Sequence, residues 1–318
     1  MFPFNALCPE VEVFADAQCT KHYTKNTSIE VKEQSAEGCT AVALAIVMKH
    51  HKFPKATTAE IPARMNHVYE TQYNNDAIWE RFSDPAIAAG TVLEWDKTLD
   101  DYYERDANGD FAEDGNGQVV YKGTYEQQRA VANLMRVAAS AVGTQYGHGD
   151  LAGSTTNDEA MIDGVKKYLK FPNIALHHKD DYNTPTEFQQ ALYNELKVAG
   201  AVFFTAQNKE GGHAFVIDGY TNEDIFSINW GWGGMCNGNY RLNSADPEYQ
   251  GRKLSQGGGY NEEQKFFSGL YADAPSGIVE LKDATRHHTD KTYDLQGRQV
   301  TGKHQGIVIC DGRKMVSR

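Results

Sequence analysis

The chain has 318 residues, with 31 lysines and arginines against 43 aspartates and glutamates, and so a net charge of −12 at pH 7. A chain of this length can bury a full hydrophobic core. The acidic balance gives no general electrostatic footprint for a phosphate backbone, so nucleic acid is not an expected partner. No run reaches the 18 apolar residues of a membrane span and no basic, apolar leader follows Met1, so we expect a protein that is soluble as written.

The cysteines are too few and too scattered for a disulfide framework, and none has the CxxC spacing of a zinc site. They are Cys8, Cys19, Cys39, Cys236 and Cys310. An odd count leaves at least one free thiol. Asp106–Asp110 begins like a calcium loop, but Phe111 replaces the required glycine and Gly117 the bidentate acid. We therefore expect neither a metal nor a cofactor.

The first predicted element is a helix over residues 40–51, which are apolar on nearly every face before a cationic end. Phe53-Pro54 then stops it. A helix that is apolar all round belongs in the core. Between residues 55 and 123 the pattern is weaker: Trp79 and Trp95 are expected core anchors, and residues 96–117, acidic and glycine-rich, are expected to form a surface loop.

Three further helices have clear signals. Thr124–Gln127 is a capping box ahead of the helical periodicity of residues 130–137. Residues 158–169 show helical spacing, and Thr184-Pro185 opens a helix that runs through Leu196. The β-rich runs 201–205, 213–220 and 225–230 follow. A helical region followed by a β region indicates an α+β fold of two lobes.

The chain changes character after about residue 274, which predicts a catalytic domain of residues 1–273 and a small β tail of residues 274–318. The tail holds short strands at 278–281, 293–300 and 306–309, separated by polar turns. It resembles C-terminal tails of exported bacterial proteins that serve sorting or surface attachment. A small stabilising hairpin is an equally good interpretation of the tail.

Three residues carry the chemistry. Cys39 opens the first helix, where the unpaired N–H groups and the positive dipole end lower the pKa of a thiol. His213 lies 174 residues later (213 minus 39) and can act as ion-pair partner, acid and base. Asn229, 16 residues beyond (229 minus 213), can orient the ring. Each residue alone is more often structural, since a lone cysteine before an apolar helix is usually a packed hydrophobe, but their joint pattern favours a thiol protease.

The segments around these residues resemble the streptopain-like cysteine peptidases. They are Gly38-Cys39-Thr40, Met48–Pro54, Gly211–Tyr220, Ile228–Gly234 and Tyr240–Leu242. The resemblance implies a papain-like fold with an N-terminal helical lobe, an antiparallel β lobe and the small β appendage. It also implies a secreted or cell-surface bacterial enzyme, an inhibitory prosegment already removed, and protein or peptide substrates with a hydrophobic residue two positions before the cleaved bond.

Other residues receive supporting roles. The Cys39 backbone N–H is one oxyanion donor. In the family an upstream glutamine is the second, but by comparison with the segments Pro3–Asn5 and Cys8-Pro9 it would fall before Met1, so Gln34 is the substitute. Trp230 or Trp232 could shield the contact between His213 and Asn229. The expected substrate-binding backbone is Gly211, Gly212 and Gly147.

The hairpin register does not bring the two polar side chains together directly. If Asn222-Glu223 is the centre of the turn, Asn229 lies opposite Val216, three residues from His213. A bulge, or strands joined differently, is then needed.

Three functions remain open. The first is a secreted cysteine endopeptidase with Cys39 as nucleophile, His213 as general acid and base, and Asn229 as orienting group. The second is a surface binding module that keeps the fold with weak or no turnover, suggested by the missing glutamine and the tail. The third is acyl transfer to an amine by the same triad.

Overall fold

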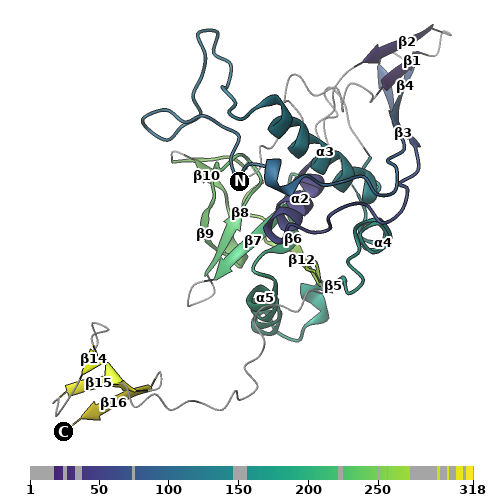
Figure 1. Cartoon of the computed structure of the whole chain (residues 1–318). Helices are drawn as coiled ribbons and strands as arrows, with labels where there is room; N and C mark the ends of the chain where they lie inside the picture. The colour runs from purple at the N-terminus through teal and green to yellow at the C-terminus, as the bar shows by residue number, and fades with distance from the viewer. Residues whose placement is uncertain are drawn as a thin grey trace. The chain divides into compact units, whose positions relative to one another are not determined.

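Figure 1 shows the computed structural model of the chain. It describes residues 18–23, 27–32, 38–73, 76–145, 156–220, 225–249, 251–255, 257–272, 292–293, 299–300, 306–310 and 313–317. The chain divides into two compact units, residues 1–272 and 273–318. The larger unit contains both clusters of buried apolar side chains that the structure describes.

The central helix, α2 (Cys39–His51), is buried along almost its whole length, as its apolar sequence predicts. Leu44 and Val47 have no exposed surface, and the burial of such side chains stabilises the fold by about 1.5–3 kcal/mol each. Gly38 precedes the helix with φ of 84°, a left-handed conformation that favours glycine. Lys52, also left-handed, ends the helix before Phe53-Pro54 is reached.

Two of the three other helices begin at the capping residues that the sequence predicts, and the third occupies the predicted residues 158–169. α3 (Tyr125–Ala141) begins with the Thr124–Gln127 capping box, in which both reciprocal hydrogen bonds form. α4 (Asp158–Leu169) is capped by Asn157, and α5 (Pro185–Ala199) by Thr184, with Pro185 in its first turn. The side-chain hydrogen bonds satisfy amide groups that a helix start otherwise leaves unpaired.

A six-stranded antiparallel sheet forms the other half of the large unit. Its order is β5-β12-β6-β7-β8-β9, with β5 (Ala175–His178), β12 (Glu262–Ser268), β6 (Val202–Gln207), β7 (Gly212–Tyr220), β8 (Ile225–Asn229) and β9 (Gly238–Arg241). Both α2 and α5 pack against β6 and β7. Alternate residues serve the two sides: Ala214 and Val216 join the cluster around α2, whereas Phe215 and Ile217 join the cluster around α5.

The pairing of β7 with β8 has the register that the sequence predicts, with Val216 opposite Asn229. The expected bulge is present too, between Ile217 and Gly219. It lies on the loop side of that pair, however, and so does not move Asn229 toward His213.

A second antiparallel sheet was not anticipated by the sequence analysis. Its order is β2-β1-β4-β3, with β1 (Gln18–Tyr23), β2 (Thr27–Lys32), β3 (Arg64–Tyr73) and β4 (Asp76–Asp84). The expected anchor Trp79 lies on β4, where side chains are outside the described residues, whereas Trp95 is buried in the core at 8% exposure. The region therefore contains strands as well as helices.

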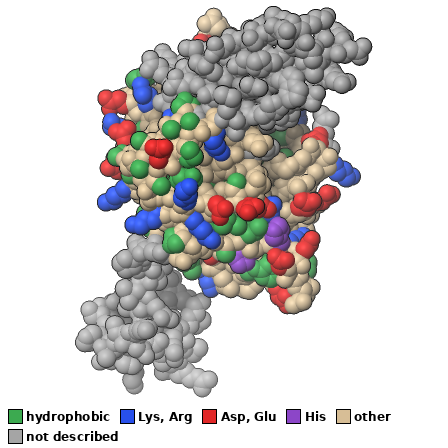
Figure 2. Space-filling view, turned by 90° about the vertical axis from the view of Figure 1, so that its right-hand side faces the viewer, with side chains coloured by type: hydrophobic (Ala, Val, Ile, Leu, Met, Phe, Trp, Pro, Cys, Tyr) green, Lys and Arg blue, Asp and Glu red, His purple; other side chains and the backbone are tan. Residues whose placement is uncertain are grey.

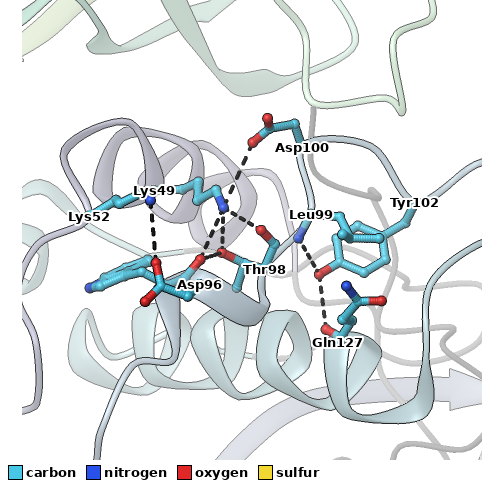
Figure 3. A network of polar contacts seen from close by, with 9 residues as sticks. Lys49, Lys52, Asp96, Thr98, Leu99, Asp100, Tyr102 and Gln127 are labelled. Carbon is cyan, nitrogen blue, oxygen red and sulfur yellow. Dashed lines mark hydrogen bonds and ion pairs between the residues drawn. The ribbon is translucent and has the colours of Figure 1, made fainter.

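The C-terminal end of α2 is tied to the short turn η1 (Trp95–Lys97) through one ammonium group (Figure 3). Lys49 Nζ donates to the Thr98 carbonyl oxygen, to Thr98 Oγ1 at 2.6 Å and to the Trp95 carbonyl oxygen at 3.3 Å. The Asp100 carboxylate lies 3.8 Å away. Lys49 is thus a nearly buried clamp between the helix and the chain that follows η1.

The remaining elements are short. The large unit also contains η3 (Lys179–Asp181), η4 (Leu242–Ser244), β10 (Glu248–Tyr249) and β11 (Arg252–Lys253). The smaller unit is an antiparallel sheet of order β14-β13-β15-β16, with β13 (Thr292–Tyr293), β14 (Gln299–Val300), β15 (Gly306–Cys310) and β16 (Arg313–Ser317). The strand expected at 306–309 lies in β15, and the one expected at 278–281 lies outside the described residues.

Surface charge is mixed on the face drawn in Figure 2, where lysine and arginine side chains stand among aspartates and glutamates. In the part of the chain that the structure describes, no helix is both long and apolar enough to cross a bilayer. Nor do the described histidines, cysteines and carboxylates form a group of three suited to a metal ion.

Candidate active site

Cys39 lies where α2 meets the sheet. Its sulfur faces the backbone N–H groups of Cys39 and Thr40 at the helix start and that of Ala214 on β7. These donors favour the thiolate, but burial is the larger effect and raises the pKa of the thiol above its ordinary value. The helix start was expected to lower this pKa together with a His213 cation, but the helix N–H groups do not offset the lost solvation.

His213 is the residue before Ala214, so the imidazole and the sulfur contact come from adjoining positions of β7. The ring is 8% exposed and surrounded by aromatic rings. Its centroid lies 4.9 Å from that of Trp232, 5.5 Å from Tyr260 and 6.1 Å from Trp230. Burial lowers the pKa of His213 to about 4, against the smaller opposing effect of a hydrogen bond to the Trp230 backbone.

That hydrogen bond defines the tautomer. Nε2 of His213 lies 2.9 Å from the carbonyl oxygen of Trp230. A carbonyl oxygen only accepts, so Nε2 carries the proton of the neutral ring and Nδ1 is the basic nitrogen.

Asn229 is 7% exposed, and its side-chain oxygen accepts the Gly231 N–H at 3.0 Å. The alternation of the strands explains this arrangement. His213 shares the α5 side of the sheet with Phe215 and Ile217, whereas Asn229 pairs with Val216, which belongs to the α2 side. The carbonyl on the imidazole thus belongs to Trp230, and Asn229 holds the turn that presents this carbonyl.

The two tryptophans lie close to the histidine. The Trp230 and Trp232 rings are stacked with centroids 5.5 Å apart, and Trp230 has no exposed surface. They enclose the imidazole from the side of the turn after β8, so both supporting residues expected from the sequence are at the site.

The expected substrate-binding glycines have different outcomes. Gly211 and Gly212 are exposed just before His213, and a Cβ at Gly211 would meet no atom within 4 Å. The two positions are therefore sterically accessible, but the Gly211 N–H and carbonyl oxygen are both bonded to Asn208. Gly147 and Gln34 lie outside the described residues.

Two polar residues at the site were missed by the sequence analysis. Tyr260 packs on His213, and the charge of Cys39 contributes to raising its pKa after the larger effect of burial. Asn208, 6% exposed, joins the turn before His213 to the loop that carries Tyr260: its side chain accepts from Glu210 N and donates to Ser255 Oγ at 2.6 Å. The only sequence signal was the turn-forming run Asn208–Gly212, which says nothing about its distant partner.

The chain is similar to known cysteine proteases over most of its length. Residues 2–240 match the Peptidase C10 family. Streptopain of Streptococcus pyogenes is 26% identical over 269 residues, which cover 84% of this chain and 58% of streptopain. The thiol protease/hemagglutinin PrtT of Porphyromonas gingivalis is 24% identical over 270 residues, covering 83% of this chain and 27% of that protein. The chain thus spans less than two thirds of the length of these relatives.

Cysteine proteases are also found among the solved structures with a similar fold. The structure of active wild-type Prevotella intermedia interpain A cysteine protease superposes with a TM-score of 0.57 at 24% identity, over 75% of this chain and 85% of that one. A prointerpain A fragment superposes with a TM-score of 0.53, also at 24% identity, over 76% of this chain and 66% of that one. The fold of the large unit is therefore papain-like α+β, as the sequence predicts.

Proposed function

Because the chain belongs to the Peptidase C10 family, we propose that it is a cysteine endopeptidase in which Cys39 is the nucleophile and His213 the general acid and base. The observation that carries this proposal is the position of the Cys39 sulfur, at the start of α2 and against the N–H of the residue next to His213. The proposed nucleophile thus contacts both the helix-start donors and the β7 backbone, one residue away from the proposed base.

The proposed reaction begins with a neutral pair. Burial raises the pKa of Cys39 and lowers that of His213, so each group alone is uncharged near pH 7. Transfer of the thiol proton to Nδ1 of His213 creates thiolate and imidazolium together and leaves the net charge of the pair unchanged. Nε2 stays on the Trp230 carbonyl, whose dipole stabilises the imidazolium.

The thiolate then attacks the carbonyl carbon of the scissile peptide bond. The Cys39 backbone N–H donates to the oxyanion. His213 passes its proton to the leaving amine as the C–N bond breaks, which leaves an acyl group on the sulfur. Water attacks the thioester carbonyl while His213 takes one of its protons, the C–S bond breaks to release the carboxylic acid product, and His213 returns the proton to the sulfur.

Substrate binding and location belong to the same proposal. Gly211 and Gly212 are exposed beside His213, and their lack of side chains lets an extended peptide pass close to this point. We keep Gln34 as the proposed second oxyanion donor and Gly147 as part of the opposite wall. A secreted or cell-surface protein, matured by removal of a prosegment, is the setting that the family likeness favours.

The test combines thiol labelling with cleavage. Iodoacetamide at pH 6 to 8, followed by peptide mapping, measures the alkylation rate of Cys39 in wild type and His213→Ala, while casein cleavage is followed in both and in Cys39→Ala. Cys236 is a matched internal control, because burial raises the pKa of this thiol to about 11 and it should react slowly. We expect His213-dependent labelling of Cys39 and a loss of cleavage of more than about 10³-fold in either variant.

Three other results would contradict the proposed function or favour a different one. Cleavage retained by Cys39→Ala would refute the assignment. Fast labelling of Cys39 without cleavage of any protein would indicate a binding module. Products whose mass includes an added amine in place of water would indicate acyl transfer.

A further inference from the structure

Residues 101–122, here called the arm, leave the core between η1 and α3 and double back twice (Figure 1). Three short runs pair through Tyr103 with Tyr121, Arg105 with Phe111 and Glu113 with Val119. Backbone hydrogen bonds such as Lys122 N to Tyr102 O, 2.9 Å, close its base.

The two turns of the arm are built by aspartates. Asp106 Oδ1 accepts the N–H groups of Asn108 and Asp110, each at 2.9 Å. Asp114 Oδ1 does the same for Asn116 and Gln118, at 2.8 and 2.9 Å. The resemblance of residues 106–110 to a calcium loop therefore has a simpler cause, since these side chains close Asx turns. The turns give the arm a defined shape.

The arm contacts the turn after β8 through one arginine. The Arg105 guanidinium donates from Nη2 to the carbonyl oxygen of Gly233. It lies over the Phe111 ring, 4.5 Å from the centroid, and Asp101 Oδ2 is 3.9 Å from its Nε. Asp101 itself accepts the Tyr103 N–H at 3.1 Å. Arg105 is thus oriented by the arm before it reaches the turn.

The fit at Gly233 is close. Its φ is 61°, and a Cβ there would lie 2.8 Å from Cε2 of Tyr103 and 3.0 Å from Cζ of Phe111. On its inner side the same turn touches α2, because a Cβ at Gly231 would lie 3.1 Å from Val42 Cγ1. The turn, residues 230–234, is therefore held between the arm and the central helix.

Residues of this turn contact the His213 imidazole. Its Trp232 ring packs on His213 and its Trp230 carbonyl accepts from Nε2. We propose that the arm is a positioning element for catalysis and that Arg105, through Gly233, keeps the Trp232 ring and the Trp230 carbonyl in place on His213. This inference rests on the proposed function, and it adds a positioning residue more than 100 positions away in sequence from the histidine that it serves.

The variants isolate the guanidinium. Arg105→Met keeps the packing on Phe111 and removes the bond to Gly233, and Arg105→Lys keeps the charge without the planar fork. Gly233→Ala disturbs the same contact from the other side. Arg129→Met is the matched control, because Arg129 also lies over an aromatic ring, Tyr125, at 5.6 Å, but on an exposed part of α3.

Two readouts separate positioning from folding. The first is the titration of the His213 ring by NMR, assigned with His213→Gln; we expect its midpoint to rise by about 1 pH unit in Arg105→Met, because a loosened turn admits water to the ring. The second is peptide cleavage, where we expect kcat to fall about 10- to 100-fold with KM nearly unchanged. Arg105→Lys should be intermediate and Arg129→Met like wild type in both.

The inference is overturned if Arg105→Met and Gly233→Ala titrate and cleave like wild type, or if they lose activity only in proportion to lost folded protein. Should Arg105→Met not fold, Arg105→Lys gives the same comparison. Because the NMR titration needs no turnover, a wild type that shows no Cys39-dependent cleavage would contradict the proposed function and leave this test intact.

Discussion

His213 is a titratable side chain enclosed by aromatic rings, and this has a consequence for stability. Its pKa is about 4 in the folded chain against an ordinary value of 6.5. Between these values the unfolded chain binds a proton that the folded chain does not, so stability is present above pH 6.5 and lost as the pH falls toward 4. The full effect is about 3 kcal/mol.

The measurement is the free energy of unfolding by urea at pH 7 and pH 5 for wild type and His213→Gln. His51, whose pKa burial also lowers to about 4, is present in both and cancels in the comparison. We expect the loss on acidification to be smaller in His213→Gln by 1 kcal/mol or more, on the order of the linkage estimate. Equal losses in the two proteins would show that His213 is not held neutral.

At the scale of single residues, the sequence could predict side chains of the candidate site but not the backbone groups that contact them. Cys39 and His213 could be chosen because they occur together in one pattern, a cysteine before an apolar helix and a histidine on a glycine-flanked strand, although neither setting alone would identify them. The atom that contacts Nε2 could not, because it is the carbonyl of Trp230, a group that every residue carries. The sequence predicted the pairing of Asn229 with Val216 correctly. Because neighbouring strand residues face opposite sides of the sheet, Asn229 lies on the other side from His213 and does not bond to its imidazole.

The clamp between α2 and η1 gives a prediction at the scale of elements. Lys49→Met leaves the Thr98 carbonyl oxygen without its donor, which costs about 1–3 kcal/mol for an unsatisfied buried group, whereas the Trp95 carbonyl oxygen keeps its bond from Thr98 Oγ1 at 2.8 Å. Lys52→Met, at the residue that ends the same helix, removes only an exposed ion pair of 3.5 Å with Asp96 (Figure 3). Exposed pairs contribute about 0–1 kcal/mol.

Thermal unfolding of the two variants is the measurement. We expect a clearly lower Tm for Lys49→Met and a nearly unchanged Tm for Lys52→Met. A similar fall in both would mean that the charge of the helix end, not the buried donor, is what matters there.

Elements with strong local signals were predictable from the sequence. α3 and α5 begin at the capping residues found in the sequence, α4 has the bounds that its helical spacing predicts, and the all-round apolarity of α2 predicted its burial. Residues 96–117 were expected to form an acidic surface loop. The three paired runs of the arm, which overlaps that stretch, were not found because they are too short for periodicity to show. Its contact with Gly233 joins residues 128 positions apart, which no local pattern reports.

At the scale of the whole molecule the two units differ in size and content. Both described hydrophobic clusters lie within residues 1–272, together with Cys39, His213 and Asn229. We therefore expect a chain ending at Ala272 to keep the Tm of the large unit and the rate of casein cleavage within about 2-fold, since substitutions distant from a site usually act independently. Parallel calorimetry and cleavage of the full and shortened chains measure this. A shortened chain that fails to fold would assign the tail a part in the stability of the large unit, in place of sorting or surface attachment.

The proposed peptidase activity would also act on other copies of this chain in solution. Cleavage needs a segment that can leave its place and extend, and such openings are easiest where few apolar contacts hold the backbone. The exposed aspartate turns of the arm fit that description, whereas α2, enclosed on all sides, opens only with the whole unit. In a stored sample, self-digestion should therefore cut the arm, which positions His213, well before it cuts α2. Molecules with a cut arm would then still carry a reactive Cys39 thiol but would cleave peptides more slowly.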